Sequence, residues 1–362
     1  MQTTNDQKAS KVFSGHIYIF HAFDVGDDIN LEKIEKSPNV RKSPLALSKY
    51  FKSYHVPLAV EIPSSPKGDY TVSCKIHNFG AISLTYKIPF NDTLENLKRD
   101  VSSLDFKFYE QSTHDIKTVF GHIKDYIAKA HFFQTRSSYT VIQIMPEADV
   151  PINNLKEQYG GIIASTLKFE TKTLAEYQKN EILESAIGYF RGDLIIVDTY
   201  ASFLYDDEYE DLLDLFEFAN IQHLELRYFD RVLETQLNAI YEGKVDKIPV
   251  SAYFPFIGVF APDPTAILGK LKADISVITE RLEGSIKLAD EPYYSELYQL
   301  LSAKLDIPNW YSSINRKLDI IKDVQSVYLH KTDAIREHIL SILVVILIFI
   351  EIIVGLLSYF KH

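Results

Sequence analysis

Cysteine is nearly absent from this sequence, because Cys74 is the single one among 362 residues. One thiol forms neither an intramolecular disulfide nor a thiolate metal cage, which fits a protein of a reducing compartment. Several catalytic motifs are also missing, namely G-x-x-x-x-G-K-[ST], H-E-x-x-H, G-x-S-x-G and C-x-x-C. The 11 histidines show no metal-ligand spacing. We therefore assign no catalytic, cofactor-binding or metal-binding residue, and we favour a non-enzymatic protein.

An excess of positive charge is missing too. The chain has 38 Lys and Arg against 49 Asp and Glu, which gives a formal net charge of -11. Because nucleic-acid binding depends on basic surface, we do not expect nucleic acid as a partner. Hydrophobic residues make up 46% and charged residues 24%. These are ordinary globular values, and the length allows two domains or one large domain with an extension.

One long apolar segment, residues 339–360, contains a single charged residue, Glu351. At a rise of about 1.5 Å per residue, a helix over this segment spans roughly 33 Å, about one hydrocarbon core. The alternative, a buried core helix, would ordinarily be shorter and carry a polar stripe. We interpret the segment as a transmembrane helix, so the lipid bilayer is the first expected partner. No apolar signal-peptide core precedes the body, and Lys331 and Arg336 flank the segment, so we expect a single-pass protein with its N-terminal body on the cytoplasmic or matrix side.

The transmembrane segment has its small and polar residues on one face. Steps of three and four residues place Ser341, Glu351, Gly355 and Ser358 on one stripe. An ionised Glu351 near the bilayer centre costs on the order of 3 kcal/mol. Small residues let helices approach and polar residues hydrogen-bond between them, so we expect this face to mediate helix association. The alternative is a protonated Glu351 that the lipid tolerates.

Two runs predict strands early in the chain. The run HIYIFHAFDV (16–25) is rich in strand-forming apolar and aromatic residues. The run YTVSCKIHNFGAISLTYKI (70–88) alternates and is typical of a hairpin with its turn at 78–80. Helical spacing dominates the C-terminal third. We therefore expect an α+β protein with a disordered tail (1–12), a soluble, strand-rich α/β body (13–250), a helical hairpin or coiled-coil stalk (251–338) and a single C-terminal transmembrane helix (339–360).

The predicted stalk continues directly into the transmembrane segment. After Pro308 no proline or glycine occurs before Gly355, so one helix of about 50 residues is expected to run from the body into the bilayer. Apolar residues recur on one side at steps of three and four, the spacing of a helical hairpin or coiled-coil seam. The seam contains Ile314, Leu318, Ile321 and Tyr328. We expect the seam and the transmembrane helix to hold a homo-oligomer.

A further helix is predicted over residues 212–241, and polar side chains follow one side of it. Glu217, Asn220, Arg227 and Arg231 keep helical spacing among apolar neighbours. Polar groups in so apolar a helix ordinarily need partners. We interpret these four residues, the polar stripe, as a salt-bridge network or a partly exposed face. The alternative is a binding site for an anion or a protein partner.

The C-terminal third also resembles a known family. It contains Pro-Tyr-Tyr at 292–294, Leu-Asp-Ile at 305–307 and Asn-Arg-Lys-Leu-Asp at 315–319, followed by the apolar run with Glu351. This order of elements resembles the required-for-meiotic-nuclear-division family, a domain of unknown function shared by bacteria, fungi and mitochondria. The run Asn-Phe-Gly-Ala-Ile at 78–82 is similar to a strand and turn of the same family. The resemblance implies a membrane-anchored, self-associating protein, with mitochondrial members linked to organellar translation, and it implies no catalytic residue.

Two functions fit these features. The first is a membrane-anchored, self-associating scaffold that recruits an unidentified protein partner to the bilayer. The second is a membrane-tethered enzyme or ligand-binding sensor that uses the polar stripe. A bound metabolite or a deep polar pocket at the stripe would distinguish the second from the first.

Overall fold

The computed structural model describes residues 11–38, 40–43, 56–62, 69–132, 136–188, 192–241, 269–273, 275–277, 280 and 292–360. Contacts divide the chain into two compact units, Met1–Tyr228 with Thr279–Trp310, and Phe229–Ile278 with Tyr311–His362. Most of the predicted tail, residues 1–10, lies outside the described residues. The same holds for most of the first part of the predicted stalk, residues 251–291.

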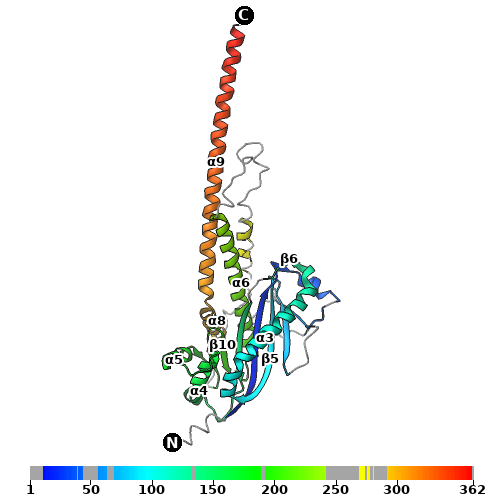
Figure 1. Ribbon diagram of the computed structural model, residues 1–362, viewed down its shortest axis with the longest axis vertical. Coiled ribbons are helices and arrows are strands. Elements are labelled where there is room, and N and C mark those ends of the chain that lie inside the picture. The colour runs from blue at the N-terminus through cyan, green and yellow to red at the C-terminus, as the bar shows by residue number, and fades with distance from the viewer. Residues whose placement is uncertain are drawn as a thin grey trace. The chain divides into compact units, whose positions relative to one another are not determined.

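The described part of the first unit is built on an eight-stranded sheet (Figure 1). In spatial order its strands are β3 (Leu58–Val60), β4 (Thr71–Ile76), β5 (Ala81–Thr93), β1 (Val12–Asp24), β7 (Ser137–Ile144), β10 (Ala201–Tyr205), β9 (Leu194–Val197) and β8 (Ala186–Ile187). The β7 and β10 strands run parallel, whereas the other neighbouring pairs are antiparallel. A second, two-stranded sheet pairs β2 (Asp28–Ile29) with β6 (Ile127–Ala128).

The β1 strand lies inside the sheet and is buried on both faces. It pairs with β5 along its whole length and with β7 along most of it. Because successive side chains of a strand point to opposite faces, Ile17 and Ile19 enter one core while Tyr18 and Phe20 face the other way. All four side chains are buried. The predicted strand therefore has apolar residues on both faces, which is typical of a strand covered on both sides.

Helices cover both faces of the sheet. The core around Ile17 and Ile19 also takes side chains from α2 (Leu31–Glu35), α3 (Leu94–Ile123), α4 (Ile152–Leu167) and α5 (Glu176–Glu184). The short 3-10 helix η2 (Lys124–Tyr126) follows α3. The opposite face is covered by the first part of α6 (Glu210–Tyr241), whose Phe216 ring stacks on Tyr139 of β7 with ring centroids 5.8 Å apart. On α8 (Pro292–Lys304), the Tyr298 hydroxyl donates to Gln222 of α6. The predicted α+β fold with its strand-rich N-terminal part is confirmed.

The turn between β4 and β5 depends on a glycine. Gly80 has a φ of 109°, a left-handed conformation that side chains with a Cβ rarely adopt. The backbone N–H of His77 donates to the Ala81 carbonyl at 2.8 Å and closes the turn. A Cβ on Gly80 would also lie 1.8 Å from the carbonyl oxygen of Gly26. The predicted hairpin with its turn at 78–80 is confirmed, and close backbone approach explains why glycine stands there.

The second unit joins the last part of α6 to α9 (Ile307–Tyr359), taken from Phe229 and Tyr311 onward. Lys317 of α9 forms ion pairs with Asp230 at 2.9 Å and Glu234 at 2.6 Å, both on α6. Ser313 donates to the same Asp230 carboxylate at 2.7 Å. Of the predicted seam, Ile314, Leu318 and Ile321 are buried, as are Leu233 and Leu237 of α6. The side chain of Tyr328 lies outside the described residues.

The α9 helix runs unbroken for 53 residues, which confirms the predicted long C-terminal helix. Its most apolar stretch is long and apolar enough to cross a membrane, and none of that stretch is buried. Large side chains such as Leu347, Phe349 and Leu357 are each more than three-fifths exposed.

We expect Gly80→Ala to lower the free energy of unfolding by about 2 kcal/mol or more, because it adds left-handed strain and a contact with Gly26. Gly121→Ala is the matched control, since a Cβ on Gly121 of α3 meets no atom within 4 Å. This control should be neutral or stabilising. Denaturant unfolding followed by circular dichroism measures both variants. Equal midpoints for the two would contradict the role of Gly80.

Candidate functional site

The predicted polar stripe lies on α6. Glu217 and Asn220 are buried, Arg227 is half-buried and Arg231 is exposed. The first three belong to the first unit, whereas Arg231 belongs to the second. Within the first unit, Glu217 and Arg227 line two different cavities.

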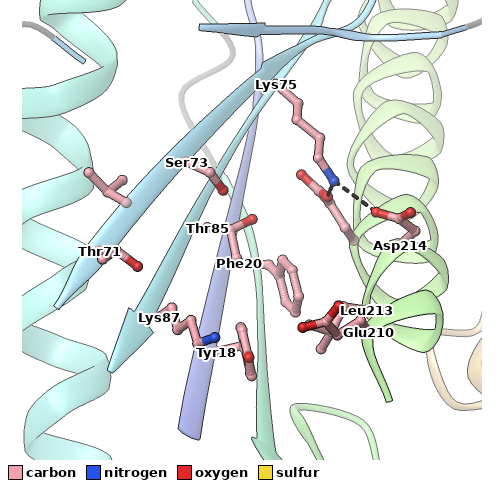
Figure 2. A pocket seen from close by; sticks show the side chains of 12 residues that line it. Tyr18, Phe20, Thr71, Ser73, Lys75, Thr85, Lys87, Glu210, Leu213 and Asp214 are labelled. Carbon is pink, nitrogen blue, oxygen red and sulfur yellow. Dashed lines mark hydrogen bonds and ion pairs between the residues drawn. The ribbon is translucent and has the colours of Figure 1, made fainter. Parts of the chain in front are cut away.

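Glu217 lies in an ion-pair cluster with Lys75. Figure 2 shows Lys75 reaching from the sheet toward Asp214, the third member of the cluster. The ammonium of Lys75, on β4, is 2.5 Å from Glu217 Oε2 and 2.9 Å from Asp214 Oδ1. The three side chains are at most 15% exposed. Burial by itself lowers the pKa of Lys75, but the carboxylates of Glu217 and Asp214 outweigh burial and raise this pKa above its ordinary value. Lys75 is therefore held as a cation between two carboxylates.

The cluster forms one end of a cavity of about 300 Å³ between the sheet and α6, which we call the lysine cavity. Figure 2 shows Tyr18, Thr85 and Lys87 on the sheet side and Glu210 on the helix side. Three carboxylates and two ammonium groups line it, namely those of Glu210, Asp214, Glu217, Lys75 and Lys87. The ion pairs of Lys75 with Asp214 and Glu217 join the helix to the sheet. Because these buried charges are already paired with each other, the cavity offers little unbalanced charge to a ligand.

Asn220 joins α6 to the start of β7. Its Nδ2 donates to the Ser137 carbonyl at 3.2 Å, while its Oδ1 is buried with no hydrogen-bond partner among the described residues. The Ser137 hydroxyl lies 3.1 Å from Nδ1 of His223, one turn further along α6. Burial, with the charge of Arg227 as a smaller cause, lowers the pKa of His223 to about 4. The His223 ring is therefore neutral at physiological pH.

Arg227 lines a larger cavity of about 730 Å³, which we call the arginine cavity. Its walls come from α3, the start of β7, the loop before β10, α6 and the turn from α8 into α9. Besides Arg227, its charged or titratable lining groups are Arg136, His223, Lys304 and Asp306. All of them belong to the first unit. Of the four stripe residues, Arg227 is the one that lines this cavity.

Sequence reasoning missed the partners that these cavities take from outside α6. Lys75 follows the buried Cys74 in an alternating strand, so it points away from that core and toward α6. This inward position of a lysine was the available signal. Arg136 lies far in the sequence from Lys304 and Trp310, and no local pattern predicts that they line one cavity.

The other candidate residues lie on α9. Ser341, Glu351, Gly355 and Ser358 are all exposed along the apolar stretch. The Ser341 hydroxyl donates to the Glu337 carbonyl at 2.9 Å, so it is satisfied within its own helix. A Cβ on Gly355 would meet no atom within 4 Å, which leaves this face open to another helix.

Among the residues that the structure describes, no group of three His, Cys, Asp or Glu side chains is placed so that it could hold a metal ion. Cys74 is buried, and burial raises the pKa of its thiol. A thiol that is both buried and protonated is a poor nucleophile and a poor metal ligand.

The family model described as uncharacterized protein MJ0711, N-terminal domain, matches residues 14–211. The chain belongs to this family. The matched residues, hereafter the family domain, contain the eight-stranded sheet apart from the first residues of β1 and end just inside α6. Lys75 and Arg136 lie within the family domain, whereas Arg227, Lys304 and Trp310 lie beyond it.

The chain is also similar to a curated relative, the uncharacterized protein MJ0711 of Methanocaldococcus jannaschii. The two are 26% identical over 247 residues, which cover 66% of this chain and 71% of the relative. No solved structure matches the chain. Since the relative is itself described as uncharacterized, the comparison transfers no activity.

We expect Lys75→Met to lower the free energy of unfolding by about 3 kcal/mol or more, because it leaves the buried carboxylates of Asp214 and Glu217 without their cation. Lys87→Met is the matched control, since Lys87 lies on the neighbouring strand and contacts the Tyr18 ring at 5.6 Å. The control should cost less than about 1 kcal/mol. Thermal unfolding compares the two. A Lys75 variant as stable as the Lys87 variant would show that the cluster does not join α6 to the sheet.

Proposed function

We propose that the protein is a membrane-anchored, self-associating protein that presents the family domain at the cytoplasmic or matrix surface of a bilayer, where it recruits a protein partner. One observation carries the proposal: no part of the most apolar stretch of α9 is buried. Exposed apolar surface on this scale is costly in water and favourable in lipid. The order of elements that resembles the required-for-meiotic-nuclear-division family also supports an anchored protein.

The charge around the apolar stretch supports the proposed side of the membrane. Lys322, Lys331 and Arg336 precede the stretch within the distance over which positive charge biases orientation. Lys361 follows it. The larger number of basic residues on the side of the body favours retention of that side in the cytoplasm or matrix.

Self-association is assigned to the apolar stretch rather than to the seam. Ile314, Leu318 and Ile321 are already buried within the single chain, where Lys317 pairs with acidic side chains of α6. The face of Ser341, Glu351, Gly355 and Ser358 is exposed and carries the small and polar residues of helix interfaces in lipid. A carboxyl group in hydrocarbon gains from a hydrogen bond to a second helix.

The ligand-binding alternative is favoured by one observation of its own. Arg227 of the predicted stripe lines the arginine cavity beside other cationic side chains. This alternative is compatible with the proposed anchoring, because a ligand-binding sensor can be held at the membrane by the same helix, α9.

We expect a chain that ends at Arg336 to leave the membrane fraction after a carbonate wash, because the apolar stretch is removed. The control is a full-length variant that carries Ile346→Asp together with Ile350→Asp. Each of these substitutions disfavours insertion of the apolar stretch into the bilayer by about 3 kcal/mol. Flotation of membranes on a density gradient measures both. Flotation of the chain ending at Arg336 would contradict the role of α9 as the anchor.

We expect Glu351→Leu to weaken association of the apolar stretch by roughly 0.6 to 2 kcal/mol, because interhelical hydrogen bonds in membranes fall in this range. Glu351→Gln should keep much of the association, since an amide still donates and accepts. The full chain in bilayers, measured by energy transfer between labelled copies, reports both variants. Equal transfer for the wild type and Glu351→Leu would contradict a role for Glu351 in association.

A further inference from the structure

The guanidinium of Arg227 is a half-buried cation without a counter-ion. Within the described residues it forms no ion pair and no hydrogen bond to a carboxylate, although it lines a cavity of about 730 Å³. Partial burial lowers its pKa from the ordinary arginine value, which shows that the charge is held at a cost. Buried and partly buried charges in proteins are ordinarily paired. An anion entering the cavity would supply the missing pair.

Two further cations line the same cavity, and their charges are not fully balanced. Arg136 stacks on the Tyr109 ring at 3.4 Å and donates to uncharged oxygens of Tyr109, Ser112 and Thr113. Lys304 lies 3.8 Å from the carboxylate of Asp198. That carboxylate is already held more closely by Lys168, at 2.6 Å. The charge of Arg136 also acts on the carboxyl group of Asp105, which lies outside the cavity lining. The positive fields of both cations are therefore reduced but not cancelled inside the cavity.

One carboxylate, that of Asp306, lines the cavity, and its negative charge acts on His223. Asp306 accepts a hydrogen bond from Asn309 Nδ2 at 2.5 Å, and its carbonyl accepts from the backbone N–H groups of Asn309 and Trp310. Its φ of 59° is a left-handed conformation that aspartate adopts more readily than most residues. Asp306 thus closes the turn into α9, and the cationic groups outnumber it in the lining.

The remaining walls suit a planar ring. Trp310, Tyr109 and Tyr200 line the cavity, and Trp310 lies 6.3 Å from His223 between ring centroids. The neutral His223 uses Nδ1 toward Ser137, and Nε2 has no hydrogen bond within the described part of the chain. The volume is in the range of cavities that bind organic molecules and far exceeds that needed for a lone phosphate. Aromatic faces and guanidinium groups both stack on nucleobases.

We propose that the arginine cavity binds a small molecule of the nucleotide class, with its phosphates on Arg227, Arg136 and Lys304 and its ring against Trp310. Arginine is suited to such a ligand because its planar fork of N–H donors matches the oxygens of a phosphate. The lysine cavity makes a useful contrast, since its two ammonium groups face three carboxylates. The proposal extends the ligand-binding alternative and does not depend on membrane anchoring, because it is tested on the full chain in detergent solution.

The test uses ADP, GDP, pyrophosphate and adenosine as probes, without magnesium, so that binding reports the protein's own cations. Equilibrium dialysis measures the affinity of the protein for each probe. A change in tryptophan fluorescence places the ligand in the arginine cavity, because Trp310 lines this cavity and is the single tryptophan of the sequence. We expect a nucleoside diphosphate to bind saturably and to change the emission, pyrophosphate to bind more weakly and adenosine most weakly. Absence of binding by ADP, GDP and pyrophosphate at millimolar concentration overturns the proposal. Binding of pyrophosphate as tight as that of ADP and GDP overturns the ring assignment.

Variants then assign the binding to the cavity. Arg227→Gln and Lys304→Gln should each weaken ADP or GDP binding by about tenfold or more, since each removes a charged hydrogen-bond donor. Arg99→Gln is the matched control, because Arg99 is an exposed arginine of α3 outside the cavity, and it should bind as the wild type does. Thermal unfolding checks that each variant is folded. If Arg227→Gln fails to fold, Lys304→Gln decides, and wild-type affinity in a folded cavity variant overturns the proposal.

Discussion

Burial of β1 on both faces is the constraint on which the rest of the structure depends. A strand with large apolar side chains on both faces must be covered twice, and here α3 and α4 cover one side while α6 covers the other. This arrangement brings α6 against the sheet, where Lys75 meets the acidic side chains of the helix. It also places the start of β7 under α6, so that Ser137 contacts both Asn220 and His223. Both cavities have walls from the sheet and from α6, so both depend on this packing of α6 on the sheet.

Much of the fold was predictable because its elements carry strong local patterns. A run of strand-forming apolar residues marked β1, alternation marked the β4–β5 hairpin, and steps of three and four residues marked α6 and α9. The order of the strands in the sheet was not predictable, since a local pattern marks a strand without showing which other strand it pairs with. The parallel pairing of β7 with β10 depends on contacts between segments about sixty residues apart. Such contacts are decided by the packing of the whole sheet and leave no local trace.

For the candidate site, the sequence predicted the polar residues of α6 but not the residues that they contact. Helical spacing identified Glu217, Asn220 and Arg227 as polar residues that need partners, and the structure supplies a partner for Glu217 and a partial one for Asn220. Those partners lie on strands, at Lys75 and Ser137, far away in the sequence. A helical pattern shows which residues share a face, but not what that face meets. This is why the spacing grouped Glu217 with Arg227, although the two residues line different cavities.

The ends of the sheet bear on how the protein behaves when many copies are concentrated. The two outer strands are β3, with three residues, and β8, with two. Strands this short expose few unpaired backbone N–H and C=O groups, so they offer a poor template for pairing with another sheet. A domain whose sheet edges offer so few unpaired backbone groups is therefore expected to resist edge-to-edge aggregation when many copies are concentrated.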